Sequence, residues 1–229
     1  MTKKCYFLCL HLWAVLFDNI NQLFYNCKSL KSLDLSNFDT SSVTDMTYMF
    51  YNCTTLSYLN LNNFVTSNVT SMSNMFSGCS SLSYLNVSSF VTSSVTSMNS
   101  MFGRCSSLTS LDLNNFDTSS VTSMNSMFYN CNKLTELDLS NFVTISVTDM
   151  SYMFEYCSSL KNLDLSNFDT SRGASMSSMF SGCSSLTNVS INFMCSNISG
   201  VLKSGTGKNY IHGWPNPFEQ DKVYMITLS

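Results

Sequence analysis

"SLDLSNFDTSSVTDMTYMFYNC", residues 32–53, recurs with small changes along most of this 229-residue chain. The recurrence is marked by cysteines that follow one another every 26 residues without insertion or deletion: Cys27, Cys53, Cys79, Cys105, Cys131, Cys157 and Cys183. Six complete units run from Cys27 to Gly182, a half unit at 17–26 precedes them, and a further unit loses the pattern at Phe193. Self-similarity at such a period is typical of repeat architectures, in which each unit packs on its neighbours.

Within a unit the spacing of apolar residues changes. Leu33 and Leu35 alternate with polar residues, which favours a brief strand with one buried face. From Val43 to Cys53 the apolar residues recur at helical spacing, which predicts a short helix with Thr44 as its N-cap. One strand and one helix cannot bury their own apolar faces. The sequence therefore predicts an α/β repeat solenoid, with a short parallel strand and a short helix in every 26-residue coil.

We expect equivalent side chains of successive coils to lie over one another in columns. The core columns would be the leucines, the paired methionines and two phenylalanine series, one from Phe38 to Phe168 and one from Phe50 to Phe180. Methionine is flexible enough to fill the gaps that identical stacking leaves.

Three regions follow from this pattern: an apolar N-terminal segment at 1–16, the repeats at 17–193 and a C-terminal cap at 194–229. The first segment has two lysines and an apolar run but lacks a signal-peptide cleavage site, so an export signal or anchor, an apolar cap and a displaced start all stay open. In the last region, alternation over 223–228 predicts a closing strand, because open ends of a repeat stack expose strand edges.

The pattern M-F-x-x-C-x-x-L-x-x-L-x-L-x-x-F, as in units such as "LDLSNFDTSSVTDMTYMF" (33–50), resembles the BspA-type leucine-rich repeat of bacterial surface proteins. The resemblance spans about 17–193. It implies a right-handed leucine-rich-repeat-like solenoid displayed outside the cell, with adhesion or binding of an extracellular protein or glycan as its role.

Composition argues against several other classes. Only 11% of the residues are charged and the net charge is -3, so no basic surface is expected to attract nucleic acid. The repeats contain no apolar run long enough for a stable membrane span. His11 and His212 are the only histidines, and "SGTGK" (204–208) lacks the spacing of a phosphate-binding loop. We therefore predict a protein that is not an enzyme and needs no cofactor.

The repeat cysteines are expected to be buried free thiols, since neighbouring coils would hold them with parallel Cβ vectors that suit disulfides poorly. Cys5 and Cys9 lack two further ligands for zinc, so no metal site is predicted.

The outward face of the predicted strands carries the candidate binding residues. Tyr58 and Tyr84 lie in consecutive units among polar residues, and tyrosine offers contact area at low entropic cost. The next column would hold Asn60, Asn86, Asp112, Asp138 and Asp164. The alternative for the tyrosines is a ring pair that stacks to stabilise the sheet. For three aspartates about 5 Å apart, a cation, a basic partner or a raised pKa would relieve the repulsion, whereas the simplest alternative is solvated carboxylates.

The sequence thus predicts a non-enzymatic, surface-displayed or secreted binding protein that recognises a protein or glycan through its polar sheet face. The alternative is a structural spacer whose variable repeats have no single ligand.

Overall fold

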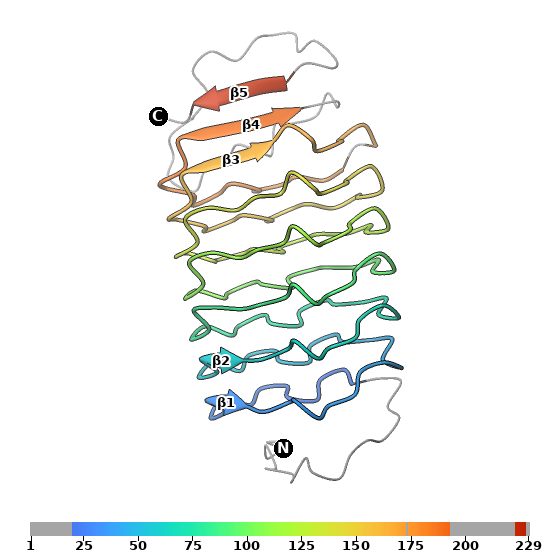
Figure 1. The fold of residues 1–229 in the computed structure, drawn as a ribbon. Coiled ribbons are helices and arrows are strands. Elements are labelled where there is room, and N and C mark those ends of the chain that lie inside the picture. Colours follow the sequence, from blue (N-terminus) through green and yellow to red (C-terminus); the bar gives the residue numbers. More distant parts are fainter. Residues whose placement is uncertain (1–19, 173, 193–222, 228–229) are drawn as a thin grey trace.

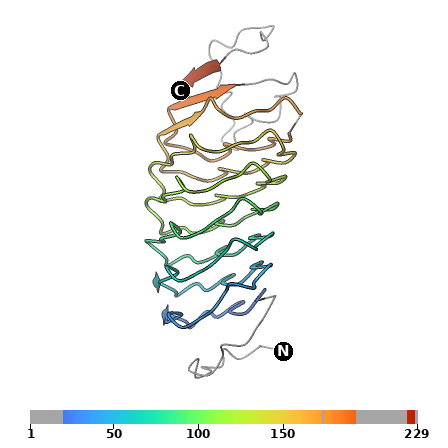
Figure 2. The ribbon, with the colours of Figure 1, turned by 45° about the vertical axis from the view of Figure 1, so that its right-hand side comes forward.

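The computed structural model describes residues 20–172, 174–192 and 223–227, and shows an elongated stack of coils (Figure 1). Each coil takes 26 residues, because residues 26 positions apart face each other in parallel register, as Ser32 faces Tyr58. A line of parallel bridges continues this register on another side of the coil: Asp45, Ser71, Ser97, Ser123, Asp149 and Ser175. Viewed from another side, the same coils lie one above the other along the whole stack (Figure 2). The predicted 26-residue stacking is therefore confirmed.

The strands are fewer than the sequence predicts. β1 (Ser32–Leu33) pairs in parallel with β2 (Tyr58–Leu59), and β3 (Asn162–Leu165) pairs in parallel with β4 (Asn188–Asn192). In the described middle coils no strand forms, so the prediction of a strand in every coil is wrong. There the coils are joined mainly along the line of bridges from Asp45 to Ser175, where the backbone hydrogen bonds between coils are most regular.

The predicted helix of each unit is also wrong, since no helix forms in the described ranges. The segment from Met46 to Cys53 is a run of overlapping turns, closed by bonds such as Met49 N–H to Met46 O (3.2 Å) and Cys53 N–H to Phe50 O (3.2 Å). Tyr48 and Asn52, each third in its turn, have φ of 58°, the left-handed region that type II turns require there. Two four-residue turns place apolar residues at nearly the spacing of a helix, which is why the sequence pattern predicted one.

Backbone hydrogen bonds between coils replace those of a helix. In one coil the alternate amides of Met46, Tyr48, Phe50 and Asn52 donate to Ser71, Ser73, Met75 and Ser77 of the next coil, over 2.7–3.1 Å. Because these amides are used between coils, the segment satisfies its backbone groups without i to i−4 bonds. We call the surface above these turns the turn face.

The predicted core columns are confirmed. Phe50, Phe76 and their equivalents are buried and stack on one another, with ring centroids 5.3–5.9 Å apart from Phe24 to Phe180 and ring planes within 3–7°. The paired methionines are buried beside them, Met46 and Met49 with no exposed surface. The second series is buried from Phe64 to Phe168, while Phe38 is only partly buried.

Two threonine columns join the coils, and the predicted N-cap role of Thr44 is wrong. Thr44 caps no helix; its carbonyl accepts the backbone N–H (2.8 Å) and hydroxyl (3.2 Å) of Thr70 in the next coil. The other column is buried, and its members Thr40, Thr66, Thr92, Thr118, Thr144 and Thr170 are at most 1% exposed.

At the far end β5 (Val223–Thr227) forms as the predicted closing strand and pairs antiparallel with β4 (Figure 1). The segment 1–16 and the remainder of the predicted cap lie outside the described residues.

Candidate binding surface

Tyr58 and Tyr84 are the most exposed large hydrophobic side chains in the described part of the chain, at 60% and 67%. β2 positions Tyr58: the next residue, Leu59, points into the core, so the tyrosine points outward. The ring contacts among the described residues do not include one between Tyr58 and Tyr84. The alternative of a stacked pair is therefore wrong, and both rings remain open to a partner.

The column of Asn and Asp side chains beside the two tyrosines stabilises turns of the backbone. In each coil its side-chain Oδ1 accepts the backbone N–H two residues later, at 2.9–3.1 Å: Asn60 from Asn62, Asn86 from Ser88, Asp112 from Asn114, Asp138 from Ser140, and Asp164 from Ser166. Such Asx turns bend the chain as it leaves the strand segment. Asn86 also donates from Nδ2 to Oδ1 of Asn62 (3.1 Å), which ties two coils together.

The pKa of Asp138 does not rise as repulsion between neighbouring carboxylates would predict. The Ser140 N–H, which donates to the Asp138 carboxylate, lowers the pKa of that carboxyl below its ordinary value of 3.8. The expectation of a raised pKa is wrong for Asp138, because hydrogen bonds from Ser140 favour the charged form of this exposed carboxyl. Over the described residues, no group of three or more His, Cys, Asp or Glu side chains could hold a metal ion.

The cysteine column lies inside the stack, and its free thiols are protonated and buried, that of Cys183 only partly. Six thiols, from Cys53 to Cys183, are free, and each Sγ–H donates to the phenylalanine carbonyl 29 residues earlier at 2.9–3.2 Å. Burial raises the pKa of the Cys53 thiol to about 11 and that of Cys131 to about 12, so neither is a nucleophile near neutral pH. Cys27 differs from the prediction of free thiols, because it is disulfide-bonded. No described coil precedes it, so its sulfur has no phenylalanine carbonyl of the kind that the other six thiols bind.

The turn face carries a pocket that the sequence did not predict. It has a volume of about 390 Å³ and lies among Tyr51, Arg104, Tyr129, Tyr152 and Glu155, over a floor of small residues. The signal was present in the repeats: when the units are aligned, Ser77 and Gly103 stand where other units carry Tyr51 and Tyr129. Only the turns show that this position faces outward, because a helix would have distributed these side chains differently.

Comparison with known proteins places the repeats in a family. The family described as "Mycoplasma protein of unknown function, DUF285" matches residues 18–111 and 106–204. The chain belongs to this family. No curated protein and no solved structure matches the chain.

The two DUF285 matches lie in tandem and together include every complete repeat unit. They support a repeat protein, and they do so without a match to the BspA-type family that the motif resembles. Among the described residues of this DUF285 chain, no helix has the length and apolar character needed to cross a bilayer.

Proposed function

We propose that this DUF285 protein is a non-enzymatic binding protein, displayed on the cell surface or secreted. It recognises an extracellular protein or glycan through its strand face, the outward surface that carries Tyr58, Tyr84, Asn60 and Asn86. The observation that carries the proposal is the exposure of Tyr58 and Tyr84, which neither pack on each other nor fill the core. An exposed aromatic pair in consecutive coils leaves apolar area in water, and a partner that covers both rings would recover that free energy.

The surroundings of the two rings support recognition rather than stability. Asn60 and Asn86 stand two residues after the tyrosines on the same exposed surface, and their amides fix the local turns through Oδ1. The turns hold this part of the surface in shape before a partner arrives, which reduces the entropy cost of binding. Tyrosines among asparagines and serines combine contact area with hydrogen bonding, as in other polar recognition surfaces.

For the fold we propose a right-handed solenoid related to the leucine-rich repeats of BspA-type surface proteins, in which turns replace the helix. The shared M-F-x-x-C-x-x-L-x-x-L-x-L-x-x-F spacing and the buried leucine column support this relation. Display outside the cell is part of the same proposal.

The second candidate is a structural spacer without a single ligand. The regularity of the coils favours it, since the inter-coil hydrogen bonds repeat almost unchanged from Met46 to Tyr156. A spacer needs only this regularity, whereas a binder needs the positions at which one coil differs from the next.

The experiment that separates the two compares the full chain with a Tyr58→Ser/Tyr84→Ser variant on arrays of extracellular proteins and glycans. The matched control is Glu136→Ser/Asn162→Ser, two changes at the same repeat position in other coils. We expect a partner whose binding weakens about tenfold or more in the tyrosine variant and little in the control, as for aromatic residues at interface centres. No bound partner, or equal binding by all three proteins, would favour the spacer.

A further inference from the structure

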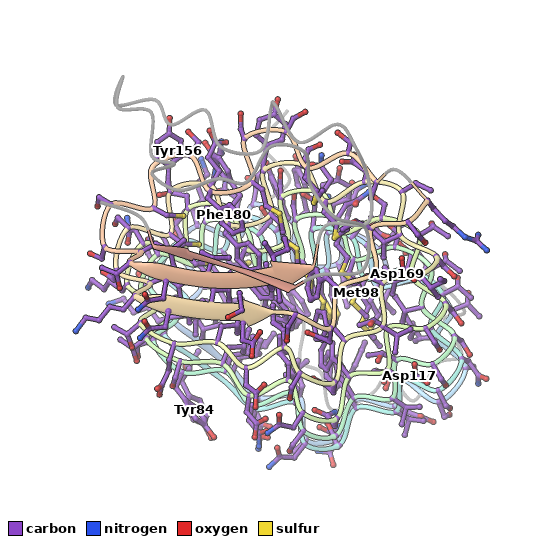
Figure 3. All side chains as sticks on the ribbon, turned by 90° about the horizontal axis from the view of Figure 1, so that it is seen from above. Tyr84, Met98, Asp117, Tyr156, Asp169 and Phe180 are labelled. Atoms are coloured by element: carbon purple, nitrogen blue, oxygen red, sulfur yellow. The ribbon has the colours of Figure 1, made fainter. Side chains whose placement is uncertain are left out.

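The turn-face pocket lies apart from the strand face. Tyr156, whose ring packs edge-on against Tyr129 of the pocket with centroids 5.9 Å apart, lies on the opposite side of the stack from Tyr84 (Figure 3). The pocket's 390 Å³ lies within the range of small-ligand sites.

The pocket arises from side-chain size in two neighbouring columns. In the first column, Ser77 and Gly103 separate Tyr51 from Tyr129; in the second, Ser100 and Ser126 precede Tyr152. Because the small residues of the second column occur one coil later than those of the first, the depression runs obliquely across the coils. Tyr51 and Tyr129 are three coils apart, or about 14 Å at the usual strand spacing. The hollow is therefore elongated, with an aromatic ring at either end.

The pocket lining combines ring faces with hydrogen-bonding groups of both kinds. The Arg104 guanidinium lies 5.5 Å from the centroid of the Tyr129 ring, which holds this donor beside an aromatic surface. Glu155 supplies an acceptor, and the hydroxyls of Ser100 and Ser126 can both donate and accept. With one positive and one negative side chain, the pocket has no net attraction for an anion.

The backbone of the floor is already used. The amides of Ser100, Gly103, Arg104 and Ser126 donate to Asn125 O, Ser100 O, Tyr129 O and Ser151 O at 2.6–3.0 Å. A peptide that binds by strand addition needs free backbone groups at an edge, and these amides offer none. Recognition must therefore come from side chains, and the ligand must present apolar C–H faces to the rings and hydroxyls to the polar groups.

We propose that the turn-face pocket binds a short, uncharged oligosaccharide, whose sugar rings pack on Tyr129 and Tyr51 while their hydroxyls pair with Arg104, Glu155 and the serines. This site is independent of the strand-face tyrosines. It needs no conformational change, because its aromatic walls are held by coil stacking.

The test fills the pocket without disturbing the fold. In Ser100→Tyr the new ring occupies a column in which Tyr48 and Tyr152 already adopt the same positive φ, so the variant is expected to fold as the parent does. Tyr129→Ser removes one aromatic wall and copies Ser77. Both are compared with the full chain and with Tyr58→Ser/Tyr84→Ser on an array of neutral oligosaccharides, and hits are titrated by calorimetry. Thermal melts verify that every variant is folded.

We expect the full chain and the strand-face variant to bind the same neutral oligosaccharide, and the two pocket variants to bind it about tenfold or more weakly. Three results would overturn the proposal: no neutral oligosaccharide is bound by the full chain, folded Ser100→Tyr binds as tightly as the parent, or the strand-face variant alone loses binding. The last result would also assign the sugar to the strand face, so the failures of the two proposals are distinguishable.

Discussion

The buried threonine column shows how one side chain joins two coils. From Thr40 to Thr144 each hydroxyl donates to the carbonyl, and accepts the amide N–H, of the residue 25 positions later. Thr118, for example, donates to Val143 O (2.9 Å) and accepts from Val143 N–H (2.8 Å). The buried hydroxyls of this column therefore join each coil to the next by side-chain hydrogen bonds. Loss of the hydroxyl would leave two part-buried backbone groups without these partners.

Thr118→Val tests this role. Valine fills nearly the same volume but can neither donate nor accept, so we expect the free energy of unfolding to fall by about 1–3 kcal/mol. The same change in Thr122, whose exposed hydroxyl donates to Thr96 O at 3.1 Å, should stay within about 0.5 kcal/mol. Urea unfolding followed by circular dichroism measures both free energies. Equal losses in the two variants would contradict a special role of the buried hydroxyl in joining the coils.

Four aspartates in Asx turns predict an acid-sensitive stability. Backbone or side-chain donors of the serine two residues later lower the carboxyl pKa of Asp39, Asp117, Asp138 and Asp169. A folded-state pKa below the unfolded value gives stability that is fully present above the unfolded pKa, about 3.8, and is lost as pH falls through the lower folded values.

The change that isolates this effect is aspartate to asparagine at all four positions. Asparagine keeps the Oδ1 acceptor, as Asn60 and Asn86 do in the same kind of turn, but does not titrate. We expect Tm of the parent to fall below about pH 3.8 more steeply than that of the variant. Melting curves from about pH 6 to pH 2 measure this, and parallel curves would rule out these carboxylates as the cause.

At the scale of the element, the turn segment depends on residues that tolerate positive φ. Two positions per coil adopt it, and the second is often Asn or Gly: Asn26, Asn52, Gly78, Asn130 and Gly182. These residues enter the left-handed region at the least cost, whereas the helix predicted from the apolar spacing would disfavour them. Turn and helix can therefore be separated by the sign of a stability change.

Asn130→Ala makes that separation. Asn130 has φ of 57°, so alanine should cost about 1 kcal/mol in a turn, although it would stabilise a helix. Asn130→Gly is the matched variant and should be neutral or stabilising. Chemical denaturation gives the free energy of unfolding of both variants. An alanine variant more stable than the parent would contradict the turn and favour a helix.

At the scale of the whole molecule, the chain is a sum of near-identical interfaces. Every coil contacts mainly the one before and the one after, through the Phe50-to-Phe180 stack and the parallel bridges. Stability in such a stack is approximately additive over neighbouring pairs, so removal of one coil leaves an equivalent interface.

Deletion of residues 53–78 should therefore give a shorter, folded protein. The coils of Cys27 and Cys79 would become neighbours in the same register, and every core column would close. Deletion of Ser80 alone should be far more damaging, because it moves each later side chain out of its column. Circular dichroism melts and small-angle scattering distinguish these outcomes; global unfolding of the 26-residue deletion would contradict additive stacking.

The sequence by itself determined the period, the coil boundaries and the identity of the core columns, because identical spacing forces equivalent residues into register whatever the local backbone does. It could also nominate Tyr58 and Tyr84, since their units break an otherwise small and polar column. It could not separate two consecutive turns from a short helix, because both place apolar residues three or four positions apart. That choice is made by the neighbouring coil, which takes the amides of Met46, Tyr48, Phe50 and Asn52. The turn-face pocket is likewise a product of the tertiary structure, since its walls and floor come from several coils whose side chains meet only when the coils are stacked.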